Sequence, residues 1–339
     1  MLALGISVLM GFAMLNFAAS AYLQRYSPNL GYWLVNQKWQ LLERTAVTDW
    51  VIVGDSSCNQ GVDIETWTAV TGGTALNLCT VGDMLLLEDV WMLQDLVRRA
   101  RGPKKVLVVH VYDMWPREPI PALLGQLPAR RVWNGGSPRV SLDLAGSIEE
   151  LLSRYVPLVS QNRALSSALE KPATFFDSNF SISERGYRSE READPERVER
   201  STASHVRALQ DSEFRISAPN RSALEALADL AVSGNMEIYL TTSPVARHLA
   251  AQAGFWRHVD VMRSELEAWA GASEKLHYID EIQSFPTDVM VNTDHVTHAG
   301  AQLYTRGLAR LVSRADSSPG GSPGNAPVNA PGKAPGHTR

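Results

Sequence analysis

The sequence predicts a three-layer α/β/α domain with a mainly parallel sheet, preceded by an N-terminal transmembrane helix. Two observations support this prediction. Short β-rich runs alternate with amphipathic helical segments along most of the chain, and such alternation implies parallel βαβ units. The first two dozen residues form an uncharged apolar run, which is typical of a membrane span.

Five strands and five helices carry the alternation. The expected strands cover residues 49–55, 74–78, 104–112, 236–242 and 276–279. The expected helices cover residues 63–70, 84–101, 221–233, 246–270 and 299–313. In a parallel sheet the loops that follow the strands meet at one edge, so side chains after the first and last strands are expected to lie together.

The N-terminal apolar run, residues 2–23, has two interpretations. As a helix it would be roughly 30 Å long, enough to cross the core of a bilayer. A cleaved signal peptide is the alternative, because Ala19-Ser20-Ala21 is typical of a cleavage site. The aromatic residues that follow favour an uncleaved anchor, since they are typical of a membrane-interface belt. They are Tyr22, Tyr26, Tyr32 and Trp33.

The expected domain organisation has four parts. Residues 1–24 are the anchor or signal segment, residues 25–46 a juxtamembrane helix, and residues 47–314 the α/β domain. Residues 315–339 are rich in Pro, Gly and Ala and are expected to be disordered. Because Arg25 and Lys38 follow the span, the positive-inside rule favours a cytoplasmic domain.

An insertion at about residues 116–215 interrupts the strand and helix alternation. It contains two predicted helices, 146–156 and 160–170, and a mixed-charge stretch from Glu184 to Arg215. Two interpretations are open: a lid or partner-binding surface, or a solvated and partly flexible excursion from the sheet.

Composition argues against several classes of function. The net charge of −4, without a basic stripe, gives no reason to expect a nucleic-acid partner. No GxGxxG or Walker sequence indicates a nucleotide, and no ligand spacing indicates a metal or another cofactor. The two cysteines, Cys58 and Cys79, could form a disulfide in an oxidising compartment or remain buried free thiols.

The sharpest motif is Gly54-Asp55-Ser56, at the end of the first strand. A serine between a strand and a helix would lie at the carboxyl edge of the sheet, beside the unpaired N–H groups of the helix. Those groups could bind an oxyanion, which favours Ser56 as a nucleophile. Because Asp and Ser also favour N-caps, a purely structural role is the alternative.

A serine needs a base to accept its proton, and the segment from Asn292 to Gly300 could supply one. Asp294 and His295 lie there, in the last loop before the final helix. Histidine would take the proton while the carboxylate orients the ring. A helix N-terminus with a surface histidine is the alternative. His110 lies inside an apolar strand and is expected to be a hydrogen-bonded core histidine.

Together the two motifs resemble the SGNH/GDSL hydrolase superfamily, over roughly residues 47–115 and 218–313. The resemblance implies a flavodoxin-like fold, Ser56 as nucleophile, and backbone N–H groups of Ser56 and Gly82 as oxyanion donors. It favours His295 over His298 as the base, because Gly300 follows His295 by five residues, as is frequent in the family. It also implies an extracytoplasmic domain, against the charge rule.

The chain departs from the family pattern at two points. Asn292 occupies the family's usual aspartate position, so Asp294 is the expected orienting residue and Asn292 its alternate. The adjacent Asp-His pair is similar to distant members that act on acyl groups of polysaccharides. The family's oxyanion asparagine after the third strand is absent, which leaves Asn59 or Asp113 as candidates.

The resemblance implies a membrane-anchored, serine-dependent O-acyl esterase or O-acyltransferase that acts on a carbohydrate or lipid ester. The alternative function is a catalytically inactive scaffold of the same fold that binds a glycan or a protein partner. The sequence does not fix the oligomeric state.

Overall fold

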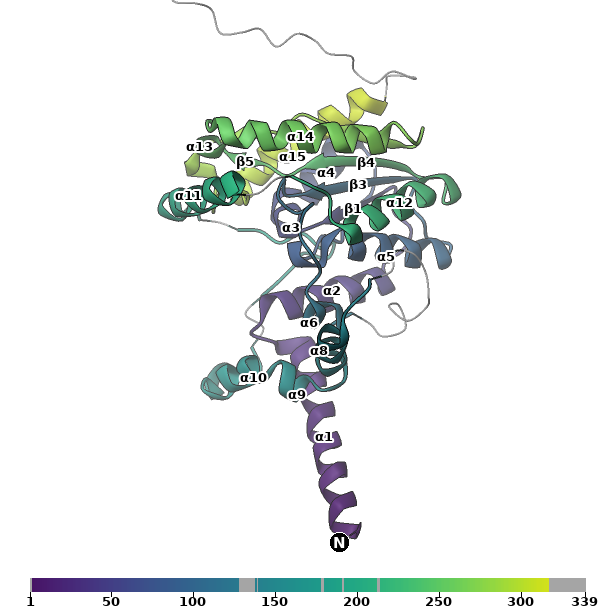
Figure 1. Ribbon diagram of the computed structural model, residues 1–339, viewed down its shortest axis with the longest axis vertical. Helices are drawn as coiled ribbons and strands as arrows, with labels where there is room; N and C mark the ends of the chain where they lie inside the picture. The colour runs from purple at the N-terminus through teal and green to yellow at the C-terminus, as the bar shows by residue number, and fades with distance from the viewer. Residues whose placement is uncertain are drawn as a thin grey trace, which may run out of the picture.

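The computed structural model describes residues 2–127, 138, 140–177, 180–190, 192–211 and 214–316. Two helices, α1 (Leu2–Tyr26) and α2 (Leu30–Arg44), precede an α/β domain (Figure 1). The predicted disordered tail lies outside the described residues, apart from its first two positions.

The domain is built on a parallel sheet of five strands in the order β2-β1-β3-β4-β6. These strands are β1 (Trp50–Gly54), β2 (Ala75–Asn77), β3 (Lys105–His110), β4 (Glu237–Thr242) and β6 (Leu276–Ile279). A second, two-stranded sheet joins β5 (Val245–Ala246) to β7 (Ser284–Phe285). The predicted α/β fold with a parallel sheet is thus confirmed. Because β2 and β3 lie on opposite sides of β1, the order of the strands reverses there, where ligands bind in such folds.

Helices cover both faces of the sheet because its strands are apolar on both sides. Val51 and Val53 of β1 pack with one set of helices, while Trp50 and Ile52 pack with the other. The first set is α2, α5 (Leu85–Arg98), α12 (Ala218–Ser233) and α14 (Ala253–Ala270). The second set is α3 (Ser56–Gly61), α4 (Ile64–Thr71) and α15 (His298–Asp316).

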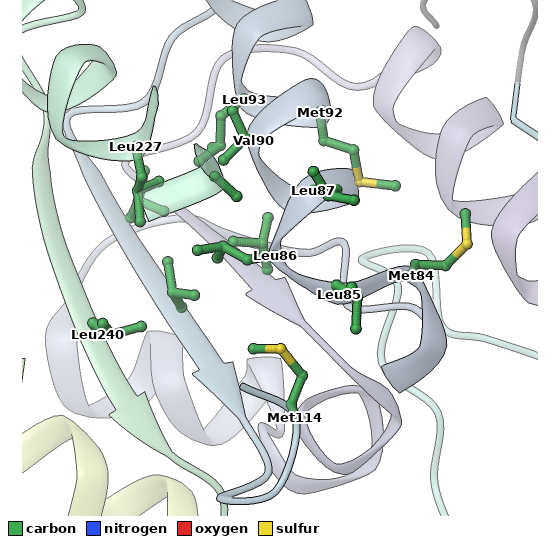
Figure 2. Packing of buried hydrophobic residues seen from close by; sticks show 14 of the residues in the cluster. Met84, Leu85, Leu86, Leu87, Val90, Met92, Leu93, Met114, Leu227 and Leu240 are labelled. Atoms are coloured by element: carbon green, nitrogen blue, oxygen red, sulfur yellow. The ribbon is translucent and has the colours of Figure 1, made fainter. Parts of the chain in front are cut away.

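The first core shows how closely the layers pack. Figure 2 shows side chains of α5 gathered with Leu227 of α12 and Leu240 of β4. Both leucines are fully buried, and burial of each such side chain contributes roughly 1.5–3 kcal/mol. This core holds the sheet rigidly, so the loops at its carboxyl edge have fixed starting points. Three short elements complete this part of the chain: η1 (Gly82–Met84), α13 (Arg247–Ala250) and η3 (Thr287–Val289).

The insertion is largely helical in its described residues. Its elements are α6 (Pro121–Leu124), α8 (Leu144–Tyr155), α9 (Pro157–Ser160), α10 (Asn162–Leu169), η2 (Pro172–Thr174) and α11 (Pro195–Asp211). α9 packs against α1 and α8, whereas α11 packs against α13 and α14 of the domain. The insertion therefore has one part beside the N-terminal helix and another beside helices α13 and α14 of the domain (Figure 1).

Two features indicate a membrane-associated or secreted protein. The segment Ala3–Tyr26 is long and apolar enough to cross a membrane. Cys58 and Cys79 form a disulfide, which is the first of the two states open from the sequence and is typical of proteins in oxidising compartments.

Candidate active site

Ser56 lies at the junction of β1 and α3. Two residues before it, the backbone takes a conformation that requires glycine. Gly54 has a φ of 144°, and a Cβ there would lie 1.9 Å from the Val109 carbonyl oxygen. This close approach turns the chain sharply out of the sheet. Asp55 then caps α3, and its carboxylate accepts hydrogen bonds from the N–H groups of Ser57 and Cys58. Ser56, the first helical residue, is the one partly exposed residue among residues 50–61.

Ser56, His295 and Asp294 lie in one hydrogen-bonded line. The Ser56 Oγ is 2.9 Å from His295 Nε2, and His295 Nδ1 is 2.7 Å from Asp294 Oδ1. Asn292 Oδ1 lies 3.1 Å from the same Nδ1. Since both neighbours of Nδ1 are acceptors, Nδ1 carries the ring proton and Nε2 is free to accept one from Ser56. The arrangement matches the geometry of a serine nucleophile, a base and an orienting carboxylate.

Asn292 and Asp294 contact the histidine in different ways. Asn292 Oδ1 also accepts the backbone N–H groups of Asp294 and His295, at 3.0 and 2.8 Å, so it fixes the turn. Burial would raise the pKa of Asp294, but the charge and hydrogen bond of His295 outweigh burial and lower it. Burial would lower the pKa of His295, but the charge and hydrogen bond of Asp294 raise it above 6.5. His298, the alternate base, contacts Tyr187 and Gln302 rather than Ser56.

A buried network of charged side chains lies next to the turn that carries Ser56. Asp55 Oδ2 accepts the Val111 N–H at 2.7 Å, which ties the ends of β1 and β3 together. His110 Nδ1 lies 3.4 Å from Asp55, and its Nε2 lies 2.6 Å from Asp89. Despite burial, the two carboxylates raise the pKa of His110 to about 9, and His110 and Ser57 hold the pKa of Asp55 well below its usual range. His110 is buried and hydrogen-bonded, as expected for a core histidine. It contacts Asp55, the residue directly before Ser56.

The expected oxyanion side holds Gly82 and an arginine. A Cβ at Gly82 would lie 3.7 Å from the Asp55 Cβ and 3.2 Å from Arg117 Nη1. Arg117 donates to Asp113 Oδ1 at 2.8 Å and lies 3.7 Å from Asp83. Arg117 therefore offsets the negative charge of Asp113, one of the two residues that the sequence leaves as oxyanion candidates. The sequence gives no signal for Arg117, because Gly82 and Asp83 lie more than 30 positions before it.

Asn59, the other oxyanion candidate, lies in a second buried network. Its Oδ1 accepts a hydrogen bond from Lys38 Nζ at 2.8 Å. Lys38 also donates to Asn77 and to the Gly186 carbonyl oxygen, and burial lowers its pKa well below the usual range. The network joins α2 and the insertion to α3. In the sequence, Lys38 is distinguished only as a positive charge after the apolar run.

The insertion holds the loop that carries His295. Ser201 of α11 bonds to the Thr293 hydroxyl and accepts its backbone N–H. The Glu190 carbonyl oxygen accepts the His298 N–H, and the Met290 carbonyl oxygen accepts that of Asp194. These contacts favour an ordered role for this part of the insertion over a solvated excursion.

Comparisons with protein-family models and with curated proteins gave no match.

Proposed function

We propose that this protein is a serine-dependent acyl-transfer enzyme of the SGNH/GDSL type, anchored to a membrane by α1. The observation that carries the proposal is the alignment of Ser56, His295 and Asp294, with Ser56 2.9 Å from the histidine base. The substrate class is an O-acylated carbohydrate or lipid, and the acyl group passes to water or to a second hydroxyl. The disulfide and the apolar helix support an extracytoplasmic domain with a single span.

The chemistry follows from the three side chains. The Ser56 oxygen attacks the acyl carbonyl as its proton moves to His295 Nε2, and Asp294 stabilises the imidazolium formed. Backbone N–H groups of Ser56 and Gly82 bind the oxyanion. When the intermediate collapses, the alcohol leaves with the proton from His295 and the acyl group stays on Ser56. Water or an acceptor hydroxyl then attacks the acyl-enzyme, with His295 again as base.

A fluorophosphonate probe tests the proposal directly, because it reacts with serines that a neighbouring base activates. We expect the wild-type full chain in detergent to be labelled at Ser56, as identified by mass spectrometry of the labelled peptide. We expect His295→Ala to lose the label. A folded wild-type protein that stays unlabelled would favour the catalytically inactive scaffold instead.

The two candidate orienting residues can be separated by their effect on pH dependence. We expect Asp294→Asn to lower kcat/KM by about 10³–10⁴-fold, because the ring loses its counter-charge and its orientation. The base must be neutral, and Asp294 raises the pKa of His295, so the wild-type acid limb lies above pH 6.5. Asp294→Asn should move that limb to lower pH.

Asn292→Ala is the matched comparison, because it leaves the charge of Asp294 in place. We expect a smaller loss and an acid limb at the wild-type position, measured on a chromogenic acetyl ester over a range of pH. A shifted limb in Asn292→Ala, with none in Asp294→Asn, would assign the orienting role to Asn292.

Arg117 supplies positive charge beside Gly82. We expect Arg117→Met to lower kcat by about 10–100-fold with a smaller change in KM, because charge develops on the carbonyl oxygen only in the transition state. Arg117→Lys should recover part of the loss. Equal activity of Arg117→Met and wild type would remove Arg117 from the mechanism.

A further inference from the structure

Helices α8 and α9 present apolar side chains outward, a feature that the acyl chemistry does not require. The exposed side chains are Leu144, Ile148, Leu151, Leu152, Tyr155 and Val159, called here the apolar ridge. The five on α8 lie at helical spacing on one side of that helix, and Val159 lies on α9, which packs against α8. Their exposed fractions range from 41% for Leu152 to 79% for Leu144.

The opposite face of α8 is polar and buried, which inverts the usual pattern of a surface helix. Ser153 is buried and donates a hydrogen bond to the Ala122 carbonyl oxygen. The side chain of Arg154 is 3% exposed and pairs with Glu150. A helix that buries its ion pair and exposes its leucines is matched to an apolar surrounding.

The ridge is fixed to the apolar helix α1, well inside that helix. The Asn16 side chain donates to the Tyr155 carbonyl oxygen at 2.6 Å and accepts the Leu158 N–H at 3.3 Å. Nearer the domain, the Tyr22 ring stacks on Phe175. At 1.5 Å per residue, Asn16 lies about 15 Å from the end of α1 at Tyr26. Figure 1 shows α9 beside α1.

The bonds of Asn16 explain why an amide stands in the middle of a largely apolar helix. The helical path is interrupted between α8 and α9, at Val156 and Pro157. Such an interruption leaves backbone N–H and C=O groups without helical partners. In hydrocarbon each unsatisfied group costs several kcal/mol, because no water can replace the lost partner. Asn16 satisfies one carbonyl and one N–H at the break while its own amide is satisfied in return.

We propose that the apolar ridge is immersed in the leaflet of the membrane nearest the domain, beside the span of α1. A bilayer core is about 30 Å thick, so a position about 15 Å from the end of α1 lies near its middle. The α1 residues on either side of Asn16, Leu15 and Phe17, are also apolar and exposed.

With the apolar ridge in the membrane, the domain contacts the bilayer at two places, α1 and the ridge, and cannot rotate freely about α1. Residues 27–29 form only a short link between α1 and α2, and the ridge adds a second, rotationally fixed contact. The active site is thereby kept at a constant orientation to the membrane surface. The inference rests on the membrane position of α1 given under the proposed function, and it is independent of the acyl chemistry.

Lipid quenching of a fluorophore tests the inference on the full chain in phosphatidylcholine vesicles. Two variants, Ile148→Cys and Val159→Cys, each carry a nitrobenzoxadiazole label on the new cysteine. The label is attached in detergent before reconstitution. The native cysteines are joined in the disulfide and are not labelled. Lipids with a spin label in the middle of the acyl chain serve as quenchers. We expect strong quenching at both positions, with a blue-shifted emission.

Two control positions make the outcomes distinguishable. Val232→Cys on α12 is 65% exposed and belongs to the sheet domain, so its label should remain in water and unquenched. Phe12→Cys on α1 reports the span itself. Quenching at Phe12 without quenching at Ile148 and Val159 would overturn the ridge proposal alone. No quenching at Phe12 would overturn the membrane position of α1. Blue-shifted but unquenched labels on the ridge would mean that protein, such as a second copy, covers it, which would also overturn the proposal.

Discussion

Ser56→Ala is expected to lower the turnover of an activated ester by about 10⁴–10⁶-fold, the scale of loss seen when a serine hydrolase loses its nucleophile. In the proposed mechanism the Oγ forms the acyl bond, and among the described residues it is the hydroxyl that bonds to His295 Nε2, at 2.9 Å. Residual turnover would come from binding and from the oxyanion donors alone. The measurement is kcat on a chromogenic acetyl ester, with the protein purified in detergent.

The variant is expected to keep its fold. Ser56 is partly exposed, and the cap of α3 is made by Asp55 rather than by Ser56. We expect the free energy of unfolding to change by about 0.5 kcal/mol or less.

Ser57→Ala is the matched control at the neighbouring position. The Ser57 Oγ is buried and donates to Asp55 at 2.5 Å. Its loss should cost roughly 1–1.5 kcal/mol of stability while turnover stays near wild type. If Ser56→Ala retained its activity, or if Ser57→Ala lost as much, Ser56 would not be the nucleophile.

The sequence predicted the sheet and the edge where the candidate site lies because both depend on local patterns. Runs such as 104–112 are apolar enough to identify a buried strand, and Gly54 before Asp55 and Ser56 signals a sharp turn. Once the strands are parallel, the loop after the last strand must return to the edge where Ser56 lies. The juxtaposition of Ser56 and His295 across 239 positions therefore followed from topology.

The supporting residues could not be predicted in this way. Lys38 contacts Gly186, 148 positions away, and a lysine near a membrane has no local pattern that indicates burial. α11 is strongly charged and resembled a solvated segment, yet Val198 on its inner side is fully buried. The apolar ridge was missed for the opposite reason, because apolar residues at helical spacing usually face a core. In each case the outcome depends on what packs against the segment.

Asp55→Ala is expected to lower the free energy of unfolding by about 3–5 kcal/mol, because it leaves the buried His110 without one of its two counter-charges. The change also removes the cap of α3 and the acceptor of the Val111 N–H. Urea unfolding followed by circular dichroism measures the loss. Asp55→Asn keeps the shape and some acceptors, so its loss should be smaller than that of Asp55→Ala.

The pH dependence of stability identifies His110 as the partner. The pKa of His110 is raised to about 9 in the folded protein, so its contribution is fully present below pH 6.5 and is lost as pH rises through about 9. Removing Asp55 lowers that folded pKa, because Asp89 alone then supports the charge. The alkaline loss of stability should therefore be complete at a lower pH, and be smaller, in Asp55→Ala than in wild type. His110→Gln is the control, since it removes the titrating ring and leaves the decline caused by other groups with a raised pKa, such as Glu88, whose pKa burial raises to about 8. Unchanged alkaline dependence in both variants would mean that Asp55 stabilises α3 only as a cap.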